Sequence, residues 1–117
     1  MADAIKIELV TPSKMLFSDL AEMVIIPGSE GVFGVLPRHA ATLANLQRGT
    51  IDVYNNGSVT RRFLIDGGVA DVLPERVIVL AERAVDLDAV SIQHLDEQLV
   101  DATEAEAAFI NAVKEAV

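Results

Sequence analysis

The feature that most constrains the fold of this 117-residue chain is a series of short apolar segments separated by turn-forming residues. The strongest turn lies at positions 55–58, Asn-Asn-Gly-Ser, between the apolar segments 51–54 and 59–65. Asn-Gly in this setting predicts a tight β-hairpin, because both residues tolerate positive φ angles. Pro-Glu at positions 74 and 75 predicts a second hairpin, because proline presets the φ angle of the first central turn residue.

Further strands are predicted by alternation and by β-branched residues. Residues 5–9 alternate between apolar and polar side chains, as in a half-buried strand. Residues 23–26 form a mostly β-branched run, which we expect Pro27 and Gly28 to close. Gly67-Gly68 predicts a bend or bulge between the two hairpins. About ten such short strands predict a flattened β-sandwich or barrel, and argue against a parallel α/β sheet.

The pattern changes near the C-terminus, where glycine and proline no longer occur and alanine is frequent. The positions Ile92, Leu95, Leu99 and Ala102 recur at helical spacing. Residues 103–106, Thr-Glu-Ala-Glu, fit a capping box at the start of a helix. We therefore expect a mainly β domain over residues 1–85 and a short C-terminal helical hairpin over 86–117. The two helices break near residues 101–103, although one bent helix fits the same pattern.

Acidic residues dominate the polar faces of this tail, and two interpretations of them stay open. The acidic faces are either simply solvated or a surface that seeks basic residues on a neighbour. The mean hydropathy of +0.38 is also open to two interpretations: an efficient aliphatic core, or apolar surface that a partner covers.

Charge and composition exclude several classes of function. The net charge of −9 makes nucleic acid and anionic membrane surfaces poor partners. The sequence contains no cysteine, which excludes disulfides, thiolate catalysis and cysteine-based metal sites. The N-terminal residues lack a secretory signal pattern, and no apolar run is long enough to cross a bilayer. We expect a cytosolic protein that reaches a membrane only through another protein.

The sequence offers no positive argument for catalysis, for a cofactor or for a metal. No serine lies in a G-x-S-x-G motif, and no phosphate-binding loop is present. The histidines, His39 and His94, have no partner at metal-ligand spacing. Asp66 and Asp71 suggest an acidic dyad, but turn and strand-edge positions explain them better. His39 follows a proline turn, so it either bonds nearby backbone groups or contacts a partner.

Residues 28–40, GSEGVFGVLPRHA, combine three glycines, a proline and a histidine, which is typical of a shaped loop. This segment resembles the G-S-E-G-x-x-G-x-x-P-x-H-A signature of the ε subunit of F-type ATP synthases, called δ in mitochondria. Three other stretches resemble that family in the same order. They are residues 7–18 (IELVTPSKMLFS), 43–53 (LANLQRGTIDV) and 66–88 (DGGVADVLPERVIVLAERAVDLD).

The resemblance implies a flattened β-sandwich followed by a helical hairpin. It also implies a non-catalytic subunit of the central rotor stalk, bound to the γ subunit, with the base of the sandwich against the loops of the membrane c-ring. Such a subunit helps couple proton-driven ring rotation to ATP synthesis. The resemblance thus places the chain at the cytoplasmic face of a bacterial inner membrane, as a peripheral protein held there by the complex.

The signature segment supplies the residues that the resemblance places at or near the ring contact. These are Ser29, Glu30, Gly31, Val32, Arg38 and His39. Some relatives carry an acidic residue where this chain has Val32, so an ion pair with a ring arginine would need Glu30 or Arg38. The resemblance leaves one alternative from another class, a free-standing β-sandwich that binds a small molecule or peptide. An aromatic-lined concave pocket would favour that alternative.

Some relatives bind ATP through a D-x-x-R-A motif at the start of the first C-terminal helix. The matching residues here are 88–92, and Ser91 replaces the arginine, so the bidentate phosphate contact is missing. We expect no specific ATP binding. The tail is short and acidic, whereas inhibitory tails of relatives carry basic residues, so we expect weak inhibition of ATP hydrolysis or none.

Overall fold

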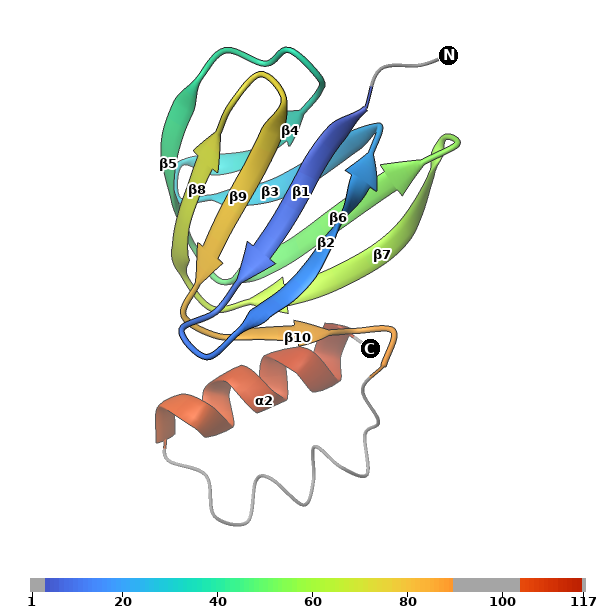
Figure 1. Cartoon of the computed structure of the whole chain (residues 1–117). Helices are drawn as coiled ribbons and strands as arrows, with labels where there is room; N and C mark the ends of the chain where they lie inside the picture. Colours follow the sequence, from blue (N-terminus) through green and yellow to red (C-terminus); the bar gives the residue numbers. More distant parts are fainter. Residues whose placement is uncertain (1–3, 90–103, 117) are drawn as a thin grey trace.

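The computed structural model describes residues 4–89 and 104–116, which form ten strands and one helix (Figure 1). The first strands are β1 (Ile5–Val10), β2 (Met15–Ala21), β3 (Met23–Gly28), β4 (Gly31–Val35) and β5 (Thr42–Leu46). The later strands are β6 (Gly49–Asn55), β7 (Ser58–Ile65), β8 (Gly68–Val72), β9 (Arg76–Ala81) and β10 (Ala84–Asp86). The helix is α2 (Glu104–Ala116).

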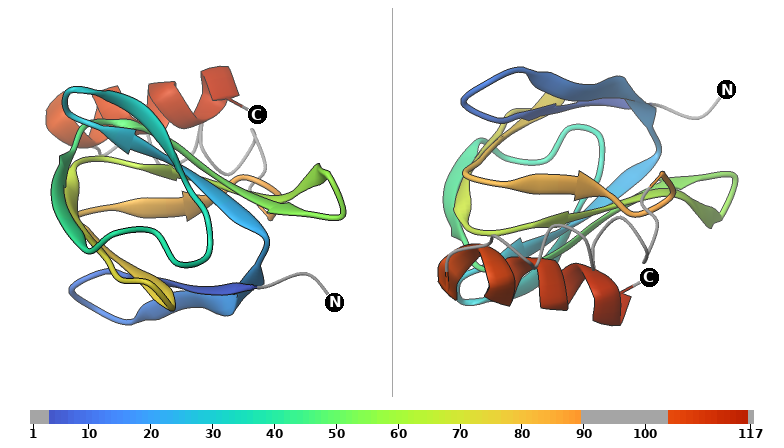
Figure 2. Two further views of the ribbon diagram at one scale, coloured as in Figure 1. Left: turned by 90° about the horizontal axis from the view of Figure 1, so that it is seen from above. Right: turned by 90° about the horizontal axis from the view of Figure 1, so that it is seen from below.

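The strands form one sheet that folds over on itself into two layers. Its order is β10-β7-β6-β3-β5-β8-β9-β1-β2, with β4 paired to β3. Neighbouring strands are antiparallel except β1 and β9, which are parallel. In Figure 1, β8, β9, β1 and β2 form the front layer, and Figure 2 shows β1 and β2 on the opposite side of the molecule from α2. The predicted β-sandwich is therefore confirmed.

The core lies between the two layers and is built from alternating residues of each strand. In β1, Ile5, Ile7 and Leu9 are buried while Lys6 points outward. The ends of the sheet approach each other at Phe17 in β2 and Phe63 in β7, whose ring centroids are 4.9 Å apart. Strand alternation thus places one face of each layer in the core, as the period-two pattern predicts.

Both predicted hairpins are present. Asn56 and Gly57 have φ angles of 55° and 77°, as the tight Asn-Gly turn requires. At the second hairpin, the Leu73 amide donates to the Arg76 carbonyl at 2.8 Å, and Val72 pairs with Val77. Local turn chemistry alone is therefore sufficient to locate these two connections.

Two predictions on the glycine-rich segment were wrong. Strand β3 does not end before Pro27 but continues through Gly28, and residues 31–35 form strand β4 where a loop was expected. Proline is tolerated because β6 pairs with β3 only as far as Ile25, while Pro27 lies opposite Val32 and still offers its carbonyl to the Gln47 amide at 3.0 Å. The segment is thus a hairpin followed by a loop.

Helix α2 is amphipathic and packs on the sandwich. Its residues Phe109, Ile110 and Val113 form a second buried cluster with Leu64 of β7 and Leu87. This confirms the second predicted helix. The first predicted helix, the break at 101–103, and Ser91, His94 and Thr103 lie outside the described residues. The domain division at residue 85 stays a prediction. Within the described residues, the structure contains no helix of the length and apolarity that a membrane crossing requires.

Candidate functional site

The six residues predicted at a ring contact separate into two groups at opposite ends of β4. Ser29 and Glu30 form the β3–β4 turn, with Gly31 and Val32 at the start of β4. Arg38 and His39 lie in the loop between β4 and β5. A five-residue strand is about 16 Å long at ~3.3 Å per residue. The structure therefore does not bring all six residues together.

The β3–β4 turn is an exposed tip on a rigid base. The Ser29 amide donates to the Asn45 carbonyl at 2.8 Å, which attaches the turn to β5. A Cβ on Gly28 would lie 2.7 Å from the Gly31 carbonyl oxygen, so glycine is required there. Glu30 is exposed and Val32 is 66% exposed. The tip thus presents one carboxylate and one apolar side chain in a fixed geometry.

The β4–β5 loop is held against the turn of the second hairpin. The Arg38 amide donates to the Pro74 carbonyl at 2.7 Å, and Arg38 itself has a φ angle of 66°. The His39 amide donates to the Leu36 carbonyl at 3.1 Å, and its ring Nδ1 donates to the Ala40 carbonyl at 2.7 Å. His39 therefore bonds nearby backbone groups, which is one of the two roles predicted for it. A contact between its other ring nitrogen and a partner stays a prediction.

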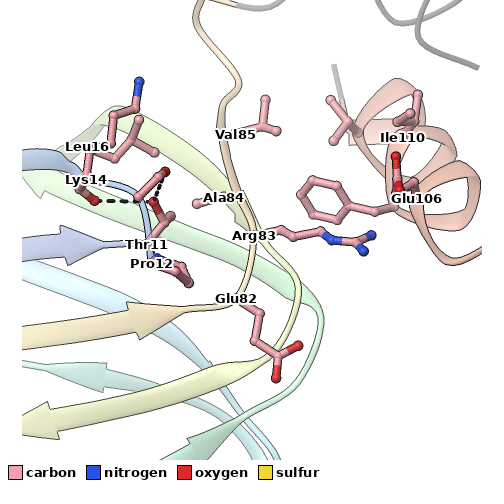
Figure 3. Close-up of a pocket in the computed structure, with 13 residues that line it drawn as sticks. Thr11, Pro12, Lys14, Leu16, Glu82, Arg83, Ala84, Val85, Glu106 and Ile110 are labelled. Carbon is pink, nitrogen blue, oxygen red and sulfur yellow. Dashed lines mark hydrogen bonds between the residues drawn. The ribbon is translucent and has the colours of Figure 1, made fainter. Parts of the chain in front are cut away.

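A cavity of about 740 Å³ lies between the β1–β2 turn, residues 82–85 and α2 (Figure 3). Thr11 and Lys14 close one side, Glu82 and Arg83 lie on the connection to β10, and α2 contributes mainly apolar side chains. Phe109 is the one aromatic residue among the described residues that line it. This described part of the lining is therefore not the aromatic surface that would favour a small-molecule module.

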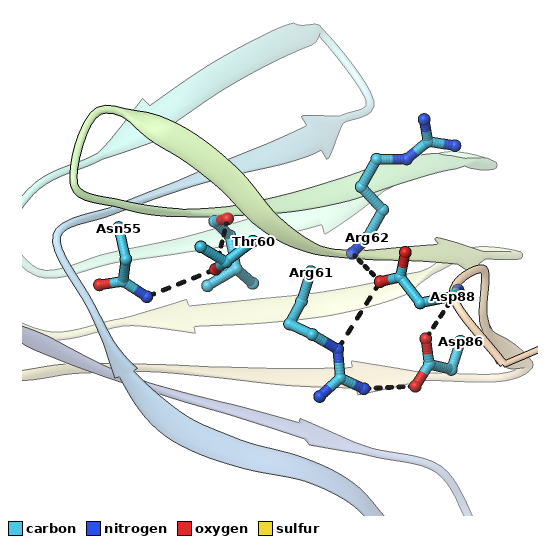
Figure 4. A network of polar contacts seen from close by, with 7 residues as sticks. Asn55, Thr60, Arg61, Arg62, Asp86 and Asp88 are labelled. Carbon is cyan, nitrogen blue, oxygen red and sulfur yellow. Dashed lines mark hydrogen bonds and ion pairs between the residues drawn. The ribbon is translucent and has the colours of Figure 1, made fainter.

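Two adjacent arginines in β7 organise a polar network that the sequence analysis missed (Figure 4). The Arg61 guanidinium pairs with Asp86, lies 3.7 Å from Asp88 through its Nε, and stacks 4.8 Å from the Phe17 ring centroid. The Arg62 amide donates to the Asp88 carboxylate at 3.3 Å. Asp88 thus anchors the chain after β10. The sequence signal that could have revealed this network is the pair of adjacent arginines in a chain of net charge −9.

The side chain of Arg62 reaches the end of α2. Its Nη2 donates to the Ala116 carbonyl at 2.7 Å, where the last helical carbonyls need partners and the helix dipole favours a cation. We predict that Arg62→Met weakens α2 docking by about 1 kcal/mol. Hydrogen exchange of the α2 amides measures this change. Arg76→Met is the control, because Arg76 is half exposed and its ion pair with Glu8, at 3.8 Å, contributes little to stability. Equal hydrogen exchange of α2 in both variants would contradict the capping role.

The suggested acidic dyad does not form. Asp66 accepts from Arg48 Nε at 3.1 Å, whereas Asp71 lies on the outward side of β8, between Leu43 of β5 and Ile78 of β9. Across residues 4–89 and 104–116, the structure brings together no group of His, Cys, Asp or Glu side chains that could hold a metal ion. Asp66 is thus part of an ion pair at a bend, and Asp71 lies on the outward surface of β8.

Comparison with known proteins agrees with the two-layer fold. Residues 4–87 match the family model described as the β-sandwich domain of the ATP synthase delta/epsilon chain. The ATP synthase epsilon chain of Rhodospirillum rubrum is 42% identical over 128 residues, covering 100% of this chain and 96% of the relative. That of Granulibacter bethesdensis is 45% identical over 108 residues, covering 92% of this chain and 78% of the relative.

Solved structures share the architecture. A chain of the Euglena gracilis mitochondrial ATP synthase, in an assembly of OSCP, F1 and c-ring, has a TM-score of 0.68 at 23% identity, with 94% of this chain and 74% of that chain covered. At this identity the likeness shows the fold alone. The fold defines a two-layer β-sandwich followed by a helix. Together with the family match, it shows that the chain belongs to the delta/epsilon chain family of ATP synthases.

Proposed function

We propose that the chain is a non-catalytic subunit of the central stalk of an F-type ATP synthase, bound to the γ subunit and to the c-ring. Family membership over residues 4–87, together with full-length similarity to bacterial epsilon chains, carries this proposal. A solved relative from Tetrahymena thermophila belongs to a central stalk and c-ring assembly, which supports the same location. The subunit then helps transmit ring rotation to γ, so that proton flow drives ATP synthesis.

The proposed location is the cytoplasmic face of a bacterial inner membrane, and contact with the membrane is indirect, through the complex. The similarity to bacterial epsilon chains supports this location. We also propose that the chain binds no ATP specifically. Asp88 is already engaged by Arg61 and by the Arg62 amide, and Ser91 stands where the nucleotide-binding relatives carry arginine.

Co-elution with γ from the same source tests the main proposal. Size exclusion at physiological salt should give one joint peak of this chain and γ. Two separate peaks from two folded proteins would contradict the stalk function and would favour a free-standing binding module.

The division of the signature segment leads to a sharper proposal on the ring. The exposed tip at Ser29, Glu30, Gly31 and Val32 contacts the ring loops, and the loop that carries His39 faces a different surface. The length of β4 between the two groups supports this assignment, because one flat ring surface meets one end of the strand more readily than both.

Single-cysteine variants test this assignment, because the native chain contains no cysteine. In the assembled synthase, Val32→Cys should cross-link to a cysteine in the ring loops, whereas His39→Cys should not react with the same short reagent. Val59→Cys, at a 38% exposed position of β7, is the control for non-specific reaction. Equal cross-linking of Val32→Cys and His39→Cys to the ring would overturn the assignment.

A further inference from the structure

Two side chains of opposite charge share the face of β6 and β7 that α2 covers. Asp52 of β6 and Arg62 of β7 are direct partners across the antiparallel pair, where the Cβ atoms of opposite residues lie about 5 Å apart. Figure 4 shows the side chains of Arg61 and Arg62 leaving β7 on opposite sides. Leu64, two residues after Arg62, packs against α2. Strand alternation therefore places Arg62, and Asp52 opposite it, on the side of the sheet where the helix docks.

The two side chains do not bind each other in this structure. Asp52 Oδ1 and Arg62 Nε are both buried, and neither atom has a hydrogen-bond partner among the described residues. Arg62 instead directs its Nη2 to the Ala116 carbonyl at the end of α2, at a distance of 2.7 Å. Buried polar atoms are nearly always paired, and an unpaired one destabilises the state that contains it. The docked position of α2 thus leaves an ion pair beside it unformed.

Release of α2 changes the acceptors that Arg62 can reach. The Ala116 carbonyl leaves with the helix, whereas Asp52 stays directly across the strands. A guanidinium and a carboxylate in opposite positions attract each other, and a bond between them would satisfy both buried atoms. The bond that forms after release offsets part of the bond that is lost, so it lowers the free energy needed to undock the helix.

We propose that Arg62 has two positions: it binds the Ala116 carbonyl when α2 is docked and the Asp52 carboxylate when α2 is released. Asp52 thereby weakens the docking of α2. The guanidinium has an acceptor in both states, which keeps docking reversible. This change of partner takes place within one chain, so it goes beyond the proposed stalk function and its test requires no other subunit.

Hydrogen exchange of the α2 amides in the full chain tests the proposal. Asp52→Asn removes the charge at nearly constant shape, and it should slow this exchange about threefold, because the released state loses its ion pair. Asp52→Glu keeps the charge and should stay close to the wild type. In the Arg62→Met background, Asp52→Asn should have no effect, because there is no arginine to change partner.

Asp71→Asn is the matched control. Asp71 is also a half-buried aspartate in a strand, but it lies on β8 in the other layer. Its replacement removes the same charge from the chain and should leave the exchange of α2 unchanged. Circular dichroism verifies that each variant is folded.

The sign of the effect separates the proposal from simpler roles of Asp52. Slower exchange in Asp52→Asn that disappears in the Arg62→Met background supports the change of partner. Faster exchange in Asp52→Asn would show that the carboxylate holds Arg62 toward the helix, and would overturn the proposal. Equal slowing in both backgrounds would also overturn it, because the effect would then come from the burial of Asp52 alone. Unchanged exchange in Asp52→Asn would show that no pair forms on release.

Discussion

Replacing Gly68 with alanine is expected to lower the free energy of unfolding by about 4 kcal/mol, among the largest effects of any single substitution. A Cβ at this position would lie 2.1 Å from the Leu80 carbonyl oxygen and 2.9 Å from the Cα of Ala81. Both neighbours are backbone atoms of a paired strand, so they cannot move without disrupting β9. The φ angle of +134° adds strain for any L side chain.

The reason for this close approach is the path of the chain. Gly67 and Gly68 carry the chain from β7 into β8, and Gly68 pairs directly with Ala81 and with Leu46. The start of β8 therefore fits between two strands with no space for a side chain. The predicted bend at this pair is confirmed. Glycine is required at position 68 as much by the close approach of the β9 backbone as by the positive φ angle.

Gly57→Ala is the matched control for Gly68→Ala. Gly57 also has a positive φ angle, +77°, but nothing lies within 4 Å of its added Cβ. Its cost should be about 1 kcal/mol, from backbone strain alone. Urea denaturation of both variants measures the difference between their free energies of unfolding. In a thermal melt, a domain of this size should lose roughly 4–8 °C of Tm for each kcal/mol of lost stability. Equal stability of the two variants would contradict the close approach at Gly68.

Replacing Val113 with aspartate is expected to detach α2 from the sandwich while the sandwich stays folded. Val113 is fully buried in the cluster of Phe109, Ile110, Leu64 and Leu87, so a carboxylate there would be buried without a partner. The expected loss of docking free energy is about 3 kcal/mol or more. A 13-residue helix is marginal in water without tertiary contacts, so the detached α2 should also unfold.

Far-UV circular dichroism and limited proteolysis measure this effect. Val113→Asp should lose helical signal and become sensitive to protease near the C-terminus, whereas the Tm of the sandwich should change little, because the core between the layers is a separate cluster. Asn111→Asp places the same side chain on the exposed face of α2 and should leave the helix in place. Unchanged helical signal in Val113→Asp would show that the second cluster does not hold the helix.

Much of the fold could be predicted because its signals are local. The Asn-Gly turn and the Pro-Glu turn each depend on the φ preferences of adjacent residues, and strand alternation depends on a repeat of two. The end of β3 was placed wrongly because proline usually interrupts pairing. A strand can continue through Pro27 only if no neighbouring strand requires a backbone N–H at that position. The neighbour that decides this is β6, which stops pairing at Ile25 and lies more than twenty residues further along the chain.

The candidate site was harder to predict than the fold. Its residues were found through the resemblance, but the sequence showed them as one continuous segment. Only the pairing of β4 with β3 revealed that Val32 and His39 lie at different ends of a strand. The polar network of Arg61, Arg62 and Asp88 was also missed, because Asp88 lies 26 residues after Arg62 and no local pattern connects it to the two arginines.

The sequence by itself determined the class of strands and turns, the helix at the C-terminus and the family, because each follows from neighbouring residues or from an ordered set of motifs. The tertiary structure alone decided which apolar residues are core and which are surface. Val69 and Val79 are the same residue in neighbouring strands, yet Val79 is buried between the layers, whereas Val69 is only half-buried on the outward side of β8. The physical reason is that burial depends on what packs against a strand face, and those contacts join residues far apart in the chain.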